Sequence, residues 1–319
     1  MKIVGLDIGF GYTKVAAKDG FYRFPSVVGS DDGRRFQNLE KRGEGTVDET
    51  VCVDGERFLV GASAMKQSES IFSASEKEWI DSLTYRALLK YAYRSIDFQK
   101  GEDVLVVTGL PVNHYLQWRD GLAETVRSVA DLIVAVEVLL QPMGSYFDCL
   151  MDDEAHIKDF DFMASRTGIM DIGYFTTDLV TMENIGFVKR LYSSHENGIS
   201  TAYMRIVRDL YETYSLTKEP REIEKVIRDG FVKVSGERID VKELIDKHLK
   251  VLNREIAAIA KNLWREGTNI DKIVITGGGA ISLRKSLDFY RQIRFVDDSQ
   301  YTNVRGYMKY GRMLQNGNV

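Results

Sequence analysis

The segments KIVGLDIGFGYTK at residues 2–14 and RTGIMDIGYFTTD at residues 166–178 decide the fold. Each segment runs from an apolar stretch, typical of a buried strand, into Asp-Ile-Gly and then into residues with hydroxyl groups. Glycine at such a turn lets the backbone bend sharply and bring its N–H groups close to an anion. One turn built twice in one chain predicts a duplicated architecture.

Strands and helices alternate around the two segments, which predicts an α/β fold. The first half also carries a hairpin signal at Asp54-Gly55 and a polar, glycine-dotted loop over 31–45. The other elements expected there are strands over 2–8, 13–18 and 21–28, a helix over 75–96 capped by Ser75, a strand over 103–111, a helix over 113–130 and a strand over 132–142.

The second half repeats the order of strand, glycine turn, strand and strand, followed by helical crossovers. Outside the turns the two halves share little residue identity, so the duplication is architectural. The elements expected there are strands over 168–172, 176–182 and 186–194, a turn followed by a long helix over 197–214, a charged and mostly helical insert over 217–248, a helix over 251–267, a strand over 271–279 and a helix starting near Ser282.

Length and charge narrow the possible functions. A chain of 319 residues is long enough for two domains, and 44% hydrophobic with 28% charged residues is ordinary for a globular protein. The net charge of -4 gives no broad attraction to phosphate backbones or anionic lipid. Neither direct nucleic-acid binding nor membrane binding is therefore expected. Cys52 and Cys149 have no metal-ligand spacing and predict two packed thiols in a reducing cytoplasm.

The first turn offers groups suited to an anion. Asp7 ends a predicted strand, and Gly9 and Gly11 free the backbone around the turn. Thr13 and Lys14 are expected to bring a hydroxyl and an ammonium group to the same place.

The second turn repeats part of this set. Asp171 and Gly173 correspond to the start of the first turn, and Thr176 and Thr177 supply hydroxyls. Two such turns can bind one polyphosphate together, with Asp7 and Asp171 holding a hydrated Mg²⁺ between them.

A third glycine-rich segment, IVITGGGAIS at residues 273–282, places Gly277, Gly278 and Gly279 between an apolar strand and a helix. Three glycines leave room for a flat base or a ribose against bare backbone. The segment lacks the G-x-G-x-x-G spacing of a dinucleotide fingerprint. Asp178 could hydrogen-bond to a residue of the site, but the favoured expectation is a solvent-exposed charge at a strand edge. The histidines are expected at the surface or at helix caps, namely His114, His156, His195 and His248.

These segments resemble motifs of the superfamily that contains actin, sugar kinases and heat-shock-chaperone ATPases. DIGFGYTK resembles the first phosphate motif, DIGYFTTD the second phosphate motif and VITGGGA the adenosine motif. The likeness is greatest to prokaryotic actin-like proteins of the plasmid-segregating ParM/StbA type and their archaeal relatives. The tail YTNVRGYMKYG at residues 301–311 is similar to a segment that follows the last strand in such proteins.

The resemblance implies two related lobes with a nucleotide cleft between them, each lobe a mixed five-stranded-type sheet flanked by helices. Lobe I would comprise residues 1–141 and 303–319, and lobe II residues 142–302. The implied catalytic residues are Gln141, which would orient the attacking water, and Asp171. The implied nucleotide-binding residues are Asp7, Gly9, Gly11, Tyr12, Thr13, Lys14, Gly173, Tyr174, Thr176, Thr177, Gly277, Gly278 and Gly279.

Two positions depart from the family pattern. Phe10 stands where many members have serine or threonine, and Met143 stands where some segregation actins have a catalytic carboxylate. Because of the second departure, Gln141 is the better candidate for the residue that orients the attacking water. The alternative for Gln141 is a structural one, a strand-end glutamine that caps the following helix.

The function implied by the resemblance is a cytoplasmic, filament-forming protein that binds and hydrolyses ATP or GTP with Mg²⁺. Its subunits would stack head to tail, for plasmid segregation or another cytoskeletal role, and an acidic chain would reach DNA through a basic adaptor protein. Three other functions are weighed: a non-polymerising small-molecule kinase or phosphatase, a filament scaffold that does not hydrolyse its nucleotide, and a chaperone ATPase. The chaperone is disfavoured because no substrate-binding domain is expected after Val319.

Overall fold

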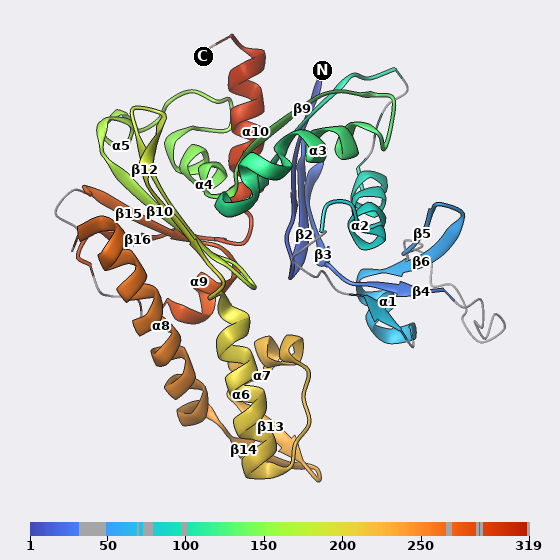
Figure 1. The fold of residues 1–319 in the computed structure, drawn as a ribbon, viewed down its shortest axis with the longest axis vertical. Coiled ribbons are helices and arrows are strands. Elements are labelled where there is room, and N and C mark those ends of the chain that lie inside the picture. The colour runs from blue at the N-terminus through green and yellow to red at the C-terminus, as the bar shows by residue number, and fades with distance from the viewer. Residues whose placement is uncertain are drawn as a thin grey trace. The chain divides into compact units, whose positions relative to one another are not determined.

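The computed structural model describes residues 1–31, 49–68, 70–72, 79–96, 98, 101–265, 270–284, 287 and 290–317. The loop expected over 31–45 lies outside these residues except for Asp31, and so does the expected cap Ser75. The chain forms two compact units (Figure 1). Unit 1 comprises residues 1–110, 114–139 and 307–319, and unit 2 comprises residues 111–113 and 140–306.

Unit 1 is built on a five-stranded sheet with the strand order β3-β2-β1-β8-β9. β1 pairs antiparallel with β2 and parallel with β8, and β2 pairs antiparallel with β3. Its strands are β1 (Lys2–Ile8), β2 (Tyr12–Ala17), β3 (Gly20–Pro25), β8 (Val104–Leu110) and β9 (Ile133–Leu140).

Unit 2 contains a second five-stranded sheet with the order β12-β11-β10-β15-β16. Its central strand β10 again pairs antiparallel on one side and parallel on the other, so both sheets follow one plan. Its strands are β10 (Thr167–Ile172), β11 (Thr177–Glu183), β12 (Gly186–His195), β15 (Lys272–Thr276) and β16 (Ile293–Phe295). The predicted duplication and the mixed five-stranded sheets are confirmed.

Helices and smaller sheets complete the units. Strands β4 (Val28–Ser30), β5 (Thr50–Val53), β6 (Glu56–Val60) and β7 (Ile71–Phe72) form a four-stranded sheet in unit 1, which contains the expected hairpin at Asp54-Gly55. The α-helices are α1 (Gly61–Gln67), α2 (Leu83–Arg94), α3 (Tyr115–Arg127), α4 (Gln141–Leu150), α5 (Phe160–Ala164), α6 (Ile199–Tyr214), α7 (Ile223–Asp229), α8 (Lys242–Trp264), α9 (Gly278–Leu283) and α10 (Thr302–Gln315). Within the described ranges, short 3₁₀ helices cover Val112–His114 and Pro220–Glu222.

The central strand of each sheet points alternate side chains into a hydrophobic core and its aspartate to the opposite face. Leu6 and Ile8 of β1 belong to the core that contains α2, and Met170 and Ile172 of β10 belong to the core that contains α6 and α8. Because successive side chains of a strand point to opposite faces, Asp171 lies on the other face of β10, the face that α4 contacts.

Three predicted helix starts were wrong. α2 begins at Leu83, where the Ser82 hydroxyl accepts a hydrogen bond from the Tyr85 amide at 3.0 Å. α8 begins at Lys242 rather than at residue 251. α9 begins at Gly278, inside the glycine triplet and ahead of Ser282.

The insert of unit 2 contains a β-hairpin that the sequence reading missed. Strands β13 (Phe231–Val234) and β14 (Glu237–Asp240) pair antiparallel around Ser235 and Gly236. Both turn residues have positive φ, 49° and 89°, which is the requirement of a two-residue type I′ turn. The alternating apolar residues and the Ser-Gly pair were a usable signal, but the dense charge of this segment favoured helix.

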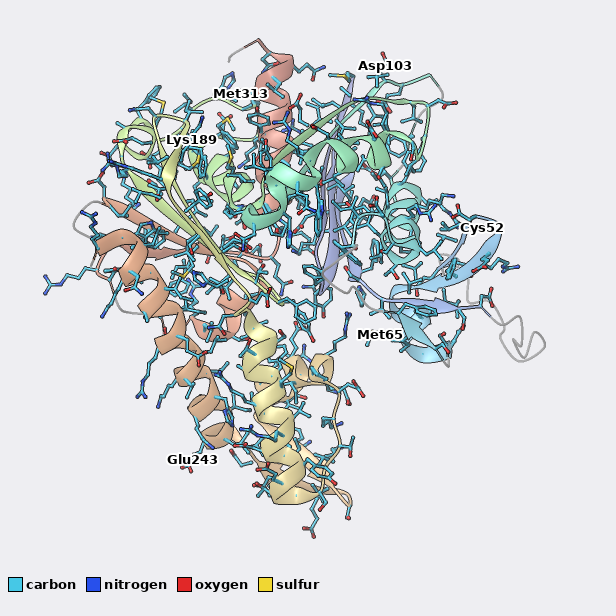
Figure 2. The ribbon with its side chains drawn as sticks, in the orientation of Figure 1. Cys52, Met65, Asp103, Lys189, Glu243 and Met313 are labelled. Carbon is cyan, nitrogen blue, oxygen red and sulfur yellow. The ribbon has the colours of Figure 1, made fainter. Side chains whose placement is uncertain are left out.

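The cysteine and histidine predictions each need one correction. Neither cysteine forms a disulfide, as expected, but Cys52 is exposed on β5 rather than packed (Figure 2). His248 is only 4% exposed, and its Nε2 lies 2.7 Å from Oδ2 of Asp209. It therefore joins α8 to α6 in the interior of unit 2 instead of lying at the surface. Among the described residues no helix combines the length and the apolar character needed to cross a membrane.

Replacing Asp209 by asparagine is expected to destabilise unit 2 by about 1–3 kcal/mol near neutral pH, because His248 and Lys247 lose a charged acceptor. Burial acts to raise the pKa of Asp209, but the hydrogen bonds from Lys247 and His248 outweigh it and lower that pKa. A lowered carboxyl pKa contributes stability above the unfolded pKa, about 3.9, and loses it as pH falls further. Urea unfolding at pH 7 and pH 3 measures both effects. Equal unfolding midpoints for Asp209→Asn and wild type at pH 7 would refute the interaction.

Candidate functional site

The first turn brings a buried carboxylate and an ammonium group together. The register of β1 and β2 places Asp7 directly opposite Lys14. Lys14 Nζ donates to Oδ2 of Asp7 at 2.8 Å, and Asp7 is only 1% exposed. Two neighbouring antiparallel strands thus fix the pair, and the lysine neutralises a carboxylate that burial would otherwise penalise.

Thr13 does not join Lys14, which corrects one prediction. Neighbouring residues on a strand point to opposite faces, so the two side chains diverge. The Thr13 hydroxyl lies 3.0 Å from the Ser26 hydroxyl, and both residues are fully buried. Any contribution of Thr13 to a ligand would have to come from its backbone.

The aromatic residues of this turn pack against the protein. Phe10, at the position where many relatives have a hydroxyl, stacks on Trp79 with ring centroids 5.3 Å apart. The Tyr12 ring lies 4.7 Å below the guanidinium of Arg23. The departure at Phe10 is therefore explained by core packing in unit 1.

The second turn places another buried carboxylate at the end of a central strand. Asp171 lies opposite Asp178 of β11 and opposite Thr276 of β15, and it is 5% exposed. Asn303 Nδ2 donates to Oδ2 of Asp171 at 2.7 Å. In unit 1 a lysine on the next strand contacts the aspartate, whereas in unit 2 an amide from α10 contacts it.

The threonine pair and Asp178 differ from expectation. The Thr176 hydroxyl donates to Oδ2 of Asp178 at 2.8 Å, and the Thr177 hydroxyl donates to the Asn197 carbonyl at 2.8 Å. Both hydroxyl protons are thus engaged within the protein. Asp178 is 2% exposed and also accepts from the Val112 amide at 3.2 Å, so the predicted exposed edge charge is a buried hydrogen-bond acceptor.

The turn at residues 173–176 is hydrogen-bonded to the start of α6. The Ile199 amide donates to the Gly173 carbonyl at 3.1 Å, and the Ser200 amide donates to the Tyr174 carbonyl at 2.9 Å. Gly198 permits this approach, because a Cβ there would lie 2.4 Å from the Tyr174 carbonyl oxygen. Gly198 was missed by the sequence reading, although Asn-Gly just before a predicted helix was a visible signal.

The glycine triplet has two different physical causes. Gly277 has φ of +90°, and a Cβ there would lie 2.3 Å from Oδ1 of Asp171. A Cβ on Gly279 would lie 2.6 Å from the Ile172 side chain. These two glycines are needed because α9 begins tightly against the end of β10. Of the three glycines, only Gly278 faces space that a ligand could use. A Cβ placed on Gly278 would lie 4.0 Å from Cγ of Gln300.

Gln141 is the first residue of α4, immediately after β9. The N-cap position belongs to Leu140, so Gln141 does not occupy the capping position itself. Pro142 follows at the start of the helix, where its missing N–H costs nothing.

The residues present fit a metal held through water better than a metal held by direct ligation. Among the described residues no group of three or more His, Cys, Asp or Glu side chains is arranged around a common point. Mg²⁺ commonly keeps several waters and uses one or two carboxylates. Asp7 and Asp171 are single carboxylates of the kind that such a hydrated ion requires.

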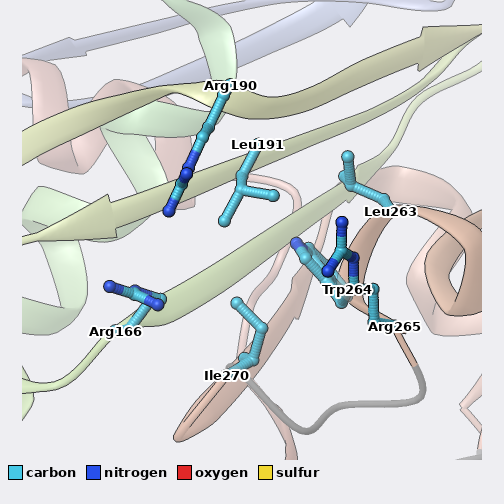
Figure 3. Close-up of a pocket in the computed structure, with 7 residues that line it drawn as sticks. All are labelled: Arg166, Arg190, Leu191, Leu263, Trp264, Arg265 and Ile270. Carbon is cyan, nitrogen blue, oxygen red and sulfur yellow. The ribbon is translucent and has the colours of Figure 1, made fainter.

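A cavity of about 190 Å³ lies elsewhere in unit 2, at the start of β10 rather than at its Asp171 end (Figure 3). Three arginines and four apolar residues line this cavity. Its volume is below the roughly 300–1,000 Å³ typical of pockets for drug-sized ligands. It is therefore not the expected nucleotide site. Its lining residues are Arg166, Arg190, Leu191, Leu263, Trp264, Arg265 and Ile270.

Comparison with protein families gives two matches. Residues 5–144 match the family model described as actin like proteins N terminal domain. Residues 169–289 match the model described as archaeal actin homologue MreB-like, C-terminal. Together the two matches include both aspartate turns and the glycine triplet. Comparison with curated proteins gives no match.

Solved structures share the fold over nearly the whole chain. A 15-stranded ParM filament from Clostridium botulinum has 19% identity and a TM-score of 0.78, covering 98% of this chain and 99% of that one. The apo pSK41 ParM protein has 24% identity and a TM-score of 0.72, covering 99% and 98%. The archaeal actin homologue Ta0583 in complex with ADP has 17% identity and a TM-score of 0.75, covering 98% and 99%.

Proposed function

Because the chain belongs to the actin-like ATPase superfamily, we propose that it binds ATP or GTP with Mg²⁺, hydrolyses the nucleotide and assembles into filaments. One observation carries the proposal. Two sheets of identical strand order each place a buried aspartate at the end of the central strand, just before a glycine turn.

We propose that both turns bind one nucleotide. Lys14 would leave Asp7 in part to contact the β and γ phosphates, and the backbone N–H groups of the two turns would contact phosphate oxygens. Gly278 would face the base or ribose. The remaining binding residues in this proposal are Gly9, Gly11, Tyr12, Gly173 and Tyr174.

Hydrolysis in this proposal depends on positioning and charge. A bound Mg²⁺ would neutralise phosphate charge, and Asp7 and Asp171 would hold its water shell. Gln141 would orient a water molecule toward the γ-phosphorus. The bond from that phosphorus to the bridging oxygen breaks as the new bond forms, and the products are inorganic phosphate and the nucleoside diphosphate.

Filament formation is supported by the shared fold with a ParM filament. We propose head-to-tail stacking, an open heterologous assembly that nucleotide binding promotes and hydrolysis weakens. The net charge of -4 disfavours direct contact with DNA, so a role in plasmid segregation would require a basic adaptor protein.

Phosphate release and light scattering, recorded together, test the proposal. Wild-type protein is expected to release phosphate from ATP or GTP and to scatter light only when nucleotide and Mg²⁺ are present. If the protein neither released phosphate nor scattered light with ATP or with GTP, the proposal would be contradicted. Turnover that required an added sugar or another small acceptor, without scattering, would instead indicate a small-molecule kinase.

Replacing Lys14 by methionine is expected to lower kcat/KM for the nucleotide by about 10–100-fold, since a charge-assisted phosphate contact is lost. Lys18→Met is the matched control, because Lys18 is exposed just beyond β2. Steady-state phosphate release measures both variants. Equal kcat/KM values for the two would exclude Lys14 from the site.

A further inference from the structure

Unit 2 contains a buried polar network that ends on Asp171 and that no motif predicted. It joins one side chain of α4, one of β15 and two at the start of α10, together with the loop before α10. All its members are at most 5% exposed. They are Ser145, Thr276, Ser299, Thr302 and Asn303.

The network fixes which way the Asn303 amide faces. A carboxylate only accepts hydrogen bonds, so the NH₂ group of Asn303 must face Asp171. The amide oxygen then faces Ser145, whose hydroxyl donates to it at 2.6 Å. A reversed amide would lose the bond to Asp171 and would place its oxygen against the carboxylate.

Ser145 is itself fixed by its neighbours. Its hydroxyl oxygen lies 2.9 Å from the hydroxyl oxygens of both Thr276 and Thr302. Thr302 also donates to the Ser299 carbonyl at 2.9 Å. Asn303 has one favourable orientation because its NH₂ side faces a carboxylate, which can only accept, and its oxygen faces a hydroxyl that donates to it.

Asp171 therefore has separate neighbours for its two carboxylate oxygens. Oδ2 accepts from Asn303 at 2.7 Å, whereas Oδ1 lies beside the bare Cα of Gly277, where a Cβ would approach to 2.3 Å. The amide on one side and the glycine on the other limit rotation of the carboxylate. Orientation matters because a group that holds metal-bound water acts only within a narrow range of geometry.

From this geometry we propose that Asn303 is a positioning residue, which orients the Asp171 carboxylate for nucleotide hydrolysis and is itself oriented by Ser145. The inference rests on the proposed function, since it assigns Asp171 to the hydrated metal. Asn303 acts through Asp171 and contacts no nucleotide. This proposal assigns a function to Asn303, the asparagine of the tail segment YTNVRGYMKYG.

Two replacements of Asn303 test the inference. Asn303→Ala removes the amide, and Asn303→Asp keeps its shape but removes its N–H donor. Both are expected to lower kcat by about 10–100-fold and to raise the Mg²⁺ concentration for half-maximal rate by about 10-fold, as for other groups that orient a metal's ligands. KM for the nucleotide should stay within about 3-fold of wild type, because ground-state contacts are unchanged.

Asn316→Asp is the matched control, since Asn316 is exposed just after α10, and it should match wild type in every measurement. Ser145→Ala, which keeps Asn303 but releases its amide, should shift the Mg²⁺ dependence in the same direction by a smaller factor. This second variant gives a reading if Asn303→Ala fails to fold, which thermal unfolding would reveal.

Two results would overturn the inference. One is an unchanged kcat and Mg²⁺ dependence in both Asn303 variants. The other is a loss of kcat that follows thermal destabilisation while the Mg²⁺ dependence stays at the wild-type value, since that indicates a structural role alone. A wild-type protein that hydrolyses no nucleotide would contradict the proposed function first, so the two failures are distinguishable.

Discussion

Asp171→Asn is expected to reduce nucleotide turnover by on the order of 100-fold while leaving the fold intact. Asparagine has nearly the same shape, and its carbonyl oxygen can still accept the hydrogen bond that Asn303 donates. What is lost is the negative charge proposed to hold the water shell of Mg²⁺. Single-turnover phosphate release separates this loss of chemistry from a loss of binding.

Asp246→Asn provides the control for this prediction. Asp246 is exposed on α8, so the same change of side chain removes a charge away from the second turn. It should hydrolyse nucleotide at the wild-type rate. If Asp171→Asn also kept the wild-type rate, Asp171 would have no part in the reaction.

Gly306→Ala is expected to destabilise unit 2 by more than about 3 kcal/mol, at or beyond the upper end of overpacking effects. A Cβ at Gly306 of α10 would lie 1.6 Å from the Gly144 carbonyl oxygen and 2.9 Å from the Asp148 amide nitrogen of α4. Both atoms belong to backbone, so no side chain can turn aside to make room. The helices would have to separate, and Arg305 would lose its 2.7 Å ion pair with Asp148.

Gly121→Ala is the matched control, because Gly121 also lies inside a helix, but a Cβ there would meet nothing within 4 Å beyond the backbone of its own helix. Alanine there should stabilise the protein by about 0.5–1 kcal/mol, since glycine is the poorer helix former. Thermal unfolding should therefore shift in opposite directions for the two variants. A Gly306→Ala protein as stable as wild type would show that α4 and α10 do not cross this closely.

Local sequence patterns predicted the fold well. The Asp-Ile-Gly turns, the alternation of strands and helices and the glycine after β15 led to two sheets of one design. Local patterns also held the signal for the β13–β14 hairpin, in its Ser235-Gly236 turn. The charge of the insert concealed that signal, because lysine, arginine and glutamate are good helix formers and favour a helix over a strand.

The contacts around the turns could not be predicted in the same way, because they join residues far apart in the chain. Thr13 pairs with Ser26 across a strand, and Asp171 pairs with Asn303 from a helix near the C-terminus. A motif identifies an aspartate but says nothing about the partner that orients it. Gly277 illustrates the same limit, since its cause is the approach of α9 to Asp171 rather than a ligand.

The central claim is that Asp7 and Asp171 hold one Mg²⁺-nucleotide. Calorimetric titration of ATP and GTP into wild type, Asp7→Asn, Asp171→Asn and the double variant tests it directly, with and without Mg²⁺. With Mg²⁺ the double variant should bind no more weakly than the weaker single variant, because either change already disrupts the shared water shell, and without Mg²⁺ the effects should add. Losses of affinity that simply add in the presence of Mg²⁺, or no uptake by wild type, would contradict the claim.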